Sequence, residues 1–229
     1  SATNLSALDG TQVSGLNITQ VAGLTATQLK AISTTDFAEF TDTQISGFTS
    51  TQLGALSATN LSSLDETAVG ALNATQLKGL TATELAGLSV TDISEFSSTQ
   101  FAGLTSTQLG ALSSTQLNAL TTTSVNSLAD TQLSGLTSTQ VGQLSATNLS
   151  ALDGTQVSGL ATTQISGLTS TQLKNLSTTD FAEITDTQIA AFSAAQIGAL
   201  TTTNFSTLDQ TAISGFTATQ LKGLTTTQL

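Results

Sequence analysis

The octad Thr105–Leu112, with the sequence TSTQLGAL, decides the fold of this chain. The same pattern recurs as TATQLKGL at Thr217–Leu224 and as SATNLSAL at Ser1–Leu8. It runs from end to end without insertion or deletion, as 28 full octads followed by the partial octad Thr225–Leu229. An unbroken short period is typical of repeat proteins, whose units bury their apolar faces against one another.

Each octad position selects its own residue types. Position one is Ser, Thr, Asp or Asn in 27 of 29 octads, and position four is Gln or Glu in 19 of 29. Positions five and eight are always Leu, Ile, Val or Phe, and position seven is Ala or Gly in 20 of 28 octads. Position three is Thr in 28 of 29 octads, and Ala195 is the exception.

These preferences predict one very short helix in each octad. Ser or Thr followed three residues later by Gln is a capping box, in which each side chain accepts a hydrogen bond from the other residue's backbone N–H. Positions five and eight share one face of a helix, whereas on a strand they point to opposite faces. Threonine gathers in positions one to three and is almost absent from positions six and seven, which suits a capped helix start.

The alternative is a β-solenoid with one short rung in each octad. Rungs this short need tight turns with Gly or Asn at a fixed place, and no octad position requires Gly. We therefore predict an all-α solenoid, a superhelix of capped helices. An isolated helix of one or two turns is unstable in water, so neighbouring octads must bury positions five and eight.

Further packing predictions come from the same frame. Ala or Gly at position seven is expected to let backbones approach closely. All nine Phe residues occupy positions five or eight and are expected in the core. For Thr at position three we expect a fixed packing contact along the stack; the alternative is an ice-binding array, which needs a flat file of threonines. The four lysines all occupy position six and are expected to be exposed: Lys30, Lys78, Lys174 and Lys222.

A longer period of 144 residues, or 18 octads, lies above the octad. Residues 1–85 match residues 145–229 at 59 of 85 positions, which indicates duplication of a block of octads. We predict a single continuous octapeptide-repeat solenoid over residues 1–229. Because the first and last octads are like the internal ones, we expect the chain to be part of a longer array.

The composition excludes several kinds of chemistry. The chain has 15 acidic residues and 4 lysines, for a net charge of -11, and it contains no Arg, His or Cys. Imidazole bases, thiolate nucleophiles and soft-ligand metal sites are therefore impossible, and nucleic-acid binding has no electrostatic source. No apolar run approaches the roughly 20 residues of a membrane span. We expect no enzymatic activity, no nucleic-acid partner and no membrane insertion.

Acidic residues cluster in three related octads and form the one candidate site. Asp at position four and Glu at position seven lie on one helical face, where their carboxylates can share a hard cation such as calcium. The preferred interpretation is that Asp replaces Gln in the capping box, that Glu is solvated and that no cofactor is bound. The calcium candidates are Asp36, Glu39, Asp42, Asp92, Glu95, Asp180, Glu183 and Asp186.

Uninterrupted TxTQLxxL octads, such as Thr105–Leu112 and Thr25–Ile32 (TATQLKAI), resemble the repeats of giant bacterial secreted and surface proteins of the adhesin-like or haemagglutinin-like kind. The resemblance covers the whole chain. It implies an extracellular or cell-surface location and a fibrous or spacer role. The calcium-binding nonapeptide GGxGxDxUx of many such proteins is absent here, so the resemblance does not imply their β-roll calcium chemistry.

The sequence favours a structural function, as a segment of a fibre, stalk or matrix filament of a bacterial surface. We expect self-association into filaments, because a uniform solenoid offers the same lateral contact repeatedly, while the negative charge keeps the chain soluble. The alternative is an adhesin binding module that recognises a surface glycan, another surface or ice. Such a module should contain octads that depart from the consensus with a cluster of exposed residues, and the sequence shows no such patch.

Overall fold

The structure, a computed structural model, describes residues 2–229 and the side-chain surroundings of residues 4–229. Over this range the chain consists of short helices joined by turns and two-residue links, with one helix in each full octad and no strand. The predicted all-α solenoid of short capped helices is confirmed, and the β-solenoid alternative is wrong.

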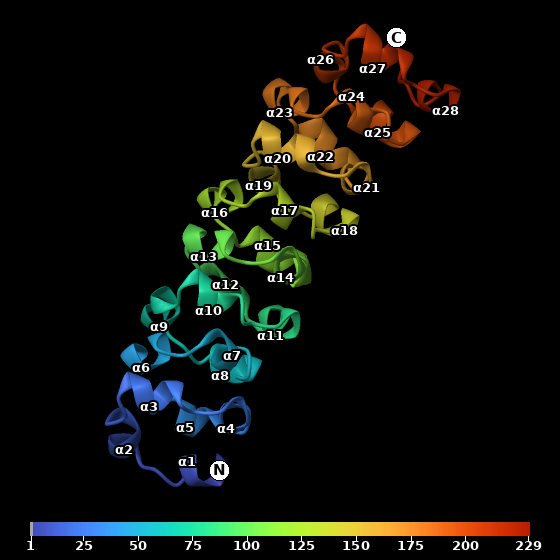
Figure 1. The fold of residues 1–229 in the computed structure, drawn as a ribbon. Helices are drawn as coiled ribbons and strands as arrows, with labels where there is room; N and C mark the ends of the chain where they lie inside the picture. The colour runs from blue at the N-terminus through green and yellow to red at the C-terminus, as the bar shows by residue number, and fades with distance from the viewer. Residues whose placement is uncertain (1) are drawn as a thin grey trace. The chain divides into compact units, whose positions relative to one another are not determined.

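The chain folds into two compact units, Ser1–Ser127 and Leu128–Leu229. Figure 1 labels the helices of both units. The single continuous solenoid over residues 1–229 stays a prediction. The helices of the first unit are α1 (Ala2–Leu5), α2 (Gly10–Ser14), α3 (Ile18–Ala22), α4 (Ala26–Lys30), α5 (Thr34–Phe37), α6 (Asp42–Ser46), α7 (Ser50–Leu53), α8 (Ala58–Leu61), α9 (Glu66–Ala71), α10 (Ala74–Leu77), α11 (Ala82–Gly87), α12 (Val90–Ser94), α13 (Ser98–Ala102), α14 (Ser106–Ala111), α15 (Ser114–Asn118) and α16 (Thr122–Asn126). Those of the second unit are α17 (Asp130–Leu133), α18 (Ser138–Gly142), α19 (Ala146–Leu149), α20 (Gly154–Gly159), α21 (Thr162–Ile165), α22 (Ser170–Asn175), α23 (Thr178–Ala182), α24 (Asp186–Ile189), α25 (Ala194–Ala199), α26 (Thr202–Phe205), α27 (Gln210–Ser214) and α28 (Ala218–Leu221).

The octad around α14 shows why the repeat is eight residues long. Thr105, the N-cap, is extended with φ −80° and ψ 161°, and positions two to seven form the helix. Leu112 at position eight is extended again, with φ −66° and ψ 139°. Positions eight and one therefore link one helix to the next. None of residues 2–229 has a positive φ, so the link needs no glycine, as predicted.

Positions five and eight form the core. Leu109 and Leu112 are at most 1% exposed, and all but one of the nine phenylalanines are buried; the exception, Phe205, is half-buried. Each large apolar side chain buried in this way contributes about 1.5–3 kcal/mol, so stability accumulates octad by octad. The four lysines are exposed, as predicted from position six.

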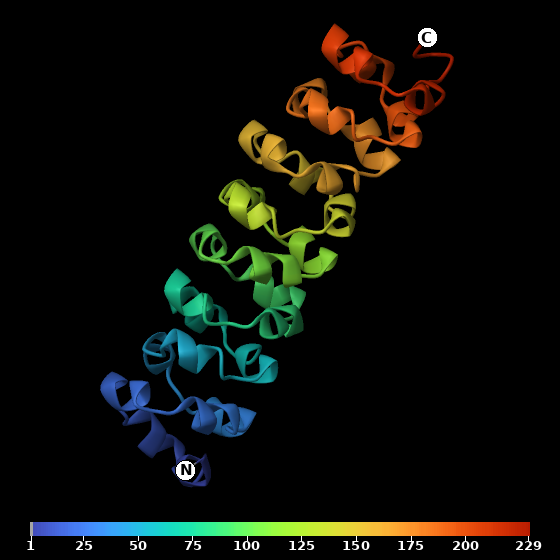
Figure 2. The same cartoon turned by 45° about the vertical axis from the view of Figure 1, so that its right-hand side comes forward.

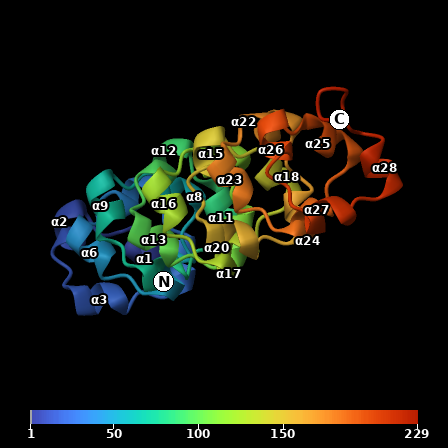
Figure 3. The same ribbon diagram turned by 90° about the horizontal axis from the view of Figure 1, so that it is seen from above.

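Helices three octads apart pack against each other within each unit. In the first unit α6 packs on α9 and α11 on α14, and in the second α22 packs on α25. Figures 2 and 3 show the same stacked arrangement from the side and from above. Hydrogen bonds between successive turns join residues 28 to 31 apart, which is just under four octads. One superhelical turn thus takes between three and four octads.

The side-chain amide of Gln108 ties two turns together. Its Oε1 accepts from Thr105 N at 2.8 Å, and Gln108 N donates to Thr105 Oγ1 at 3.2 Å, which completes the predicted capping box. Its Nε2 donates to Leu77 O at 2.9 Å and to Leu80 O at 2.7 Å, in the octad of α10. The last carbonyls of a short helix lack intrahelical partners. One side chain therefore caps the start of its own helix and the end of a helix in the preceding turn.

This amide clamp recurs along both units. All buried polar residues among residues 4–229 stand at position four, and 14 of these 18 are glutamines. A buried amide is tolerated because both its oxygen and its N–H groups are hydrogen-bonded. Sequence alone does not predict the second half of the clamp, although a signal is present. A capping box accepts Glu as readily as Gln, yet position four holds 18 Gln and only one Glu, and only Gln carries N–H donors.

Small residues at position seven allow close approach between turns, as predicted. A Cβ on Gly79, at position seven, would lie 2.0 Å from Ser50 O. A Cβ on Gly54, at position six of its octad, would lie 2.1 Å from Gly79 O. The same pairing recurs in the second unit between Gly142 and Gly167. At these crossings two backbones are in direct contact and no side chain fits between them.

Candidate functional site

Among the aspartates at position four, Asp92 replaces Gln in a complete capping box, as predicted, whereas at Asp36 and Asp180 the serine N-cap accepts from the Asp N–H without a complete box. Ser89 and Asp92 form a complete capping box, and Ser33 Oγ accepts from Asp36 N at 3.1 Å. A hydrogen bond from Ser6, followed by one from Ser33, holds the pKa of Asp36 below its ordinary value of 3.8. The aspartates at position four are Asp36, Asp92 and Asp180.

A serine about one turn earlier binds each of these carboxylates. Ser62 Oγ donates to Asp92 Oδ2 at 2.6 Å, and Ser150 Oγ donates to Asp180 Oδ2 at 2.8 Å. Both bonds span 30 residues, close to one superhelical turn. The carboxylates therefore replace the amide clamp with a contact at the surface.

The glutamates at position seven are half-buried, so the expectation that they are solvated is wrong. Glu39 lies over Gly10, where a Cβ would be 3.7 Å from Glu39 Cδ. Glu183 lies over Gly154 in the same way, at 3.5 Å from its Cγ. Position seven thus packs against position two of the octad three units earlier, which covers the glutamate. Glu39 Oε2, like the equivalent atom of Glu95, is buried without a hydrogen-bond partner among the described residues.

Burial and neighbouring carboxylates disfavour the charged forms of Glu95 and Glu183. Burial is the main cause that raises the pKa of Glu95 above its ordinary 4.5, followed by the charges of Asp92, Glu66 and Asp65. Burial, then Asp180 and Asp153, raises the pKa of Glu183 in the second unit. Both shifts favour the protonated form.

The three sites share a spacing that the octad frame hides. Four aspartates stand at position one: Asp9, Asp65, Asp153 and Asp209. The first three are each followed, three octads later, by Asp at position four and Glu at position seven, whereas fewer than three octads follow Asp209. The offset is close to one turn, and in two of the three groups the charge at position one acts on the glutamate, Asp65 on Glu95 and Asp153 on Glu183. We call these groups the acidic clusters: Asp9–Asp36–Glu39, Asp65–Asp92–Glu95 and Asp153–Asp180–Glu183. The position-one aspartates do not belong to the calcium candidates; the constant three-octad offset is the signal that identifies them.

Asp42 and Asp186 lie elsewhere. Asp42 and Asp65 line an open cavity of about 160 Å³ whose walls include Phe37 and Phe40. Asp186 lines the counterpart in the second unit, of about 200 Å³, together with Asp209. Neither lining contains Asp or Glu from position four or seven.

These arrangements offer little chemistry. Within residues 2–229, no three carboxylates are placed to hold a metal ion together, and calcium binding stays a prediction. The carboxylates near each cluster are capped or covered by serine and glycine. No lysine among residues 4–229 borders the cavity at Asp42, the cavity at Asp186 or the small cavity lined by Asp180 and Glu183.

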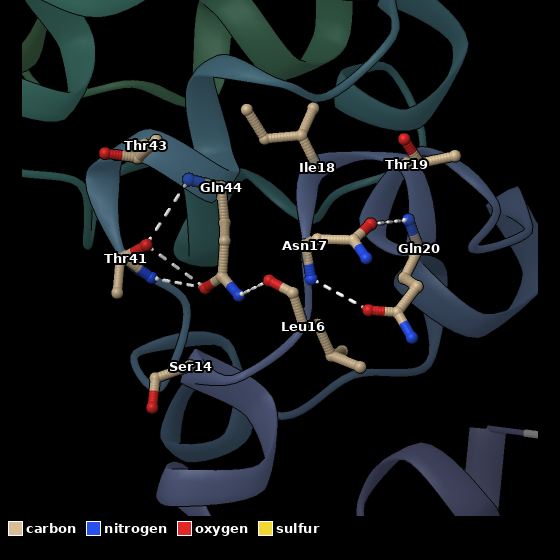
Figure 4. Close-up of a pocket in the computed structure, with 9 residues that line it drawn as sticks. All are labelled: Ser14, Leu16, Asn17, Ile18, Thr19, Gln20, Thr41, Thr43 and Gln44. Atoms are coloured by element: carbon tan, nitrogen blue, oxygen red, sulfur yellow. Dashed lines mark hydrogen bonds between the residues drawn. The ribbon is translucent and has the colours of Figure 1, made fainter.

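A groove of about 780 Å³ lies near the start of the first unit (Figure 4). Gln44 and Thr41 form one capping box beside it, and Asn17 and Gln20 form another. The side-chain oxygens and backbone N–H groups of both boxes are therefore occupied by the fold, whereas Gln20 Nε2 donates no hydrogen bond among the described residues. The hydroxyls of Thr19 and Thr43, at position three of their octads, border the groove and make no hydrogen bond (Figure 4).

Position three is exposed in every octad from the second onward, so the expectation of a fixed packing contact for Thr is wrong. The physical reason is that position three is the second residue of the helix, on the face opposite positions five and eight. Among residues 4–229, Thr227 is the one position-three threonine whose hydroxyl is hydrogen-bonded, to Thr225 Oγ1 at 3.0 Å. We call these exposed side chains the threonine array.

The described helices are all too short to cross a membrane. The predicted calcium candidates therefore lie either in the acidic clusters or in the cavities at Asp42 and Asp186. The threonine array is a further candidate site. Comparison with protein families and with curated proteins finds no family model and no protein that matches this chain.

Proposed function

We propose that this protein is structural, a segment of a fibre, stalk or matrix filament of a bacterial surface. The observation that carries this proposal is the amide clamp, repeated with the same partners in octad after octad. Gln108 binds Leu80 O, and Gln172 in the second unit binds Leu144 O, each 28 residues earlier. Because each clamp reaches only the preceding turn, added octads bring their own bonds, and length is not limited by a closed core.

The surface supports the same function. Charged residues make up 8% of the chain and the net charge is -11, so the surface is rich in hydroxyls with a weak negative charge. Net charge of one sign keeps long arrays from collapsing onto each other. We propose extracellular or cell-surface location and lateral self-association, which uses faces repeated at every turn.

Electron microscopy of the purified chain tests the fibre proposal. We expect elongated particles that associate laterally as the concentration rises. A variant in which residues 57–112, seven octads, are duplicated should give particles longer by a constant increment. The reason is that each added octad brings its own clamp to the preceding turn. Compact particles at every concentration, with no increase in length in the duplicated variant, would contradict the proposal.

A further inference from the structure

Threonine at position three is selected more strictly than its surroundings explain. Position two, next to it on the same helix turn, varies among Ala, Ser, Thr, Gly, Asp, Glu, Gln, Val and Ile. Position one exchanges Ser and Thr freely. Position three holds Thr in 28 of 29 octads and never Ser. Since the octads have diverged at position two, common descent alone does not explain the uniformity of position three.

The fold does not use the hydroxyl. The threonine array is exposed from Thr11 to Thr227, and these hydroxyls lack hydrogen bonds within the described residues except at Thr227. The other uniform positions are all explained by burial or capping. An exposed side chain that is kept constant without a structural partner points to recognition from outside.

The octad of α25 shows that the helix forms without this threonine. Ala195 stands at position three there, yet Ser193 and Gln196 still form a complete capping box. Gln196 Nε2 still clamps the preceding turn through Leu168 O at 2.8 Å. Capping and clamping are therefore independent of position three.

We propose that the threonine array is a set of acceptor sites for O-linked glycosylation, with one site in each octad that has threonine at position three. A glycosyltransferase supplies the sugar from a nucleoside-diphosphate sugar. Threonine Oγ1 attacks the anomeric carbon, the bond from that carbon to the diphosphate breaks, and the nucleoside diphosphate leaves with the electron pair. The hydroxyl proton passes to a base of the transferase. This modification is independent of the fibre proposal, because a bare filament and a glycosylated monomer are both physically possible.

Charge favours a neutral sugar over a phosphate at these sites. Each phosphate adds about 1.5–2 negative charges at pH 7. The chain already carries a net charge of -11, with four lysines and no Arg to pair with phosphates. Phosphorylation of each octad would therefore produce strong self-repulsion, whereas a neutral glycan adds hydration without charge.

The placement of the array favours separate modification of each octad over docking on one flat surface. A superhelical turn takes three to four octads, so consecutive position-three threonines face different directions around it. A flat partner, such as an ice face or a crystalline polymer, touches one side only and would select Thr on that side. The uniform sequence instead suits an enzyme that acts on every octad in turn.

Site-resolved mass spectrometry of the protein isolated from its natural host tests the proposal. We expect hexose or N-acetylhexosamine additions on position-three threonines, including Thr107, and none at Ala195, which serves as the internal control. Protein made in a host without the transferase should lack them. Bare position-three threonines in the natural protein would overturn the proposal, and so would sugars spread equally over positions one and two.

A pair of variants made in the natural host separates the site from the fold. Thr107→Val should remove one sugar addition, whereas Ser106→Ala, at the neighbouring position two, should remove none, with the same circular dichroism spectrum for both. Equal sugar content in the two variants would overturn the assignment. If the bare recombinant protein restrains ice growth and the natural protein carries no sugar, the array is a binding face and the proposal is wrong.

Discussion

The amide of Gln108 donates to the backbone carbonyl of Leu80 over 2.7 Å and 28 residues of sequence. The same side chain accepts from Thr105 N at 2.8 Å. One glutamine thus fixes both the helix boundary and the height of a superhelical turn. In octads where the side chain at position four carries no N–H donor, the effect on stability of losing this clamp can be measured.

Glu84 is the one position-four glutamate. Its Oε2 accepts from Thr81 N, which keeps the capping box, but a carboxylate has no hydrogen to give to the preceding turn. By register, Leu53 and Leu56 supply the carbonyls that a glutamine here would clamp, and burial raises the pKa of Glu84 above its ordinary 4.5. Glu84→Gln should therefore stabilise the chain by about 1–2 kcal/mol at pH 7, measured by urea unfolding.

The gain from Glu84→Gln should shrink in acid. Because folding raises the pKa of Glu84, the folded state binds this proton more tightly than the unfolded state does. The folded protein therefore gains stability as the pH falls through the folded pKa toward 4.5. At pH 4 the protonated acid supplies one donor, so wild type and variant should converge. A variant that is no more stable than wild type at pH 7 would refute the clamp at this octad.

Ala161, like Ala129, lacks the side-chain acceptor that Ser, Thr, Asp or Asn provides at the other described N-caps. Gln164 Oε1 still accepts from Ala161 N at 2.9 Å, so half of the capping box remains. Ala161→Thr should add the missing bond to Gln164 N and raise stability by about 1 kcal/mol in thermal unfolding. Ala195→Thr, at position three, is the matched control and should change stability by less than about 0.5 kcal/mol. Equal effects of the two substitutions would contradict the assignment of the caps.

Two glycines should respond in opposite ways to the same substitution. A Cβ on Gly79 would lie 2.0 Å from Ser50 O, so Gly79→Ala must push two turns apart. Gly70, inside α9, has nothing within 4 Å of its would-be Cβ, and Gly70→Ala should stabilise by about 0.5–1 kcal/mol through helix propensity. Circular dichroism melting should show a fall for the first variant and a rise for the second. A rise for both would mean that the turns are not in backbone contact.

The acidic cluster around Glu95 should make the protein more stable in mild acid than at neutral pH. The folded pKa of Glu95 lies above 4.5, so stability increases as the pH falls through that pKa and levels off near 4.5. At lower pH, protonation of Asp36 reduces stability, because folding lowers the pKa of Asp36 and so stabilises its charged form. We expect a stability maximum at mildly acidic pH.

Glu95→Gln should raise stability at pH 7 and flatten this dependence above pH 4.5. Asp42→Asn removes the same charge from the first turn of α6, where a carboxylate is favourable, and should cost a few tenths of a kcal/mol. Melting curves from pH 4 to 8 compare the two variants. A Glu95→Gln profile parallel to that of wild type would show that cluster repulsion does not affect stability.

The sequence predicts what depends on neighbours along the chain. Thr105 and Gln108 reveal a capping box by their spacing alone, and Leu109 and Leu112 reveal a shared helical face. It does not predict what depends on the length of a superhelical turn. Gln108 and Leu80 become partners only once the pitch of the superhelix is known.

The acidic clusters and the threonine array show the same limit. Asp65 stands three octads before the octad that holds Asp92 and Glu95, and its effect on Glu95 depends on the pitch of the superhelix rather than on any local pattern. Thr107 is exposed, although a uniform position in a repeat usually packs. Its exposure follows from the direction of position three on the helix, which became definite only with the fold.

Unfolding of Gln108→Glu against Gln20→Glu tests the amide clamp most directly. Both substitutions keep the capping box, but Gln20 Nε2 donates no hydrogen bond within the described residues, whereas Gln108 Nε2 donates two. At pH 7 we predict that Gln108→Glu costs about 2–4 kcal/mol, because a buried carboxylate then faces two carbonyls, and that Gln20→Glu costs less than about 0.5 kcal/mol. Equal losses for the two variants would contradict the clamp.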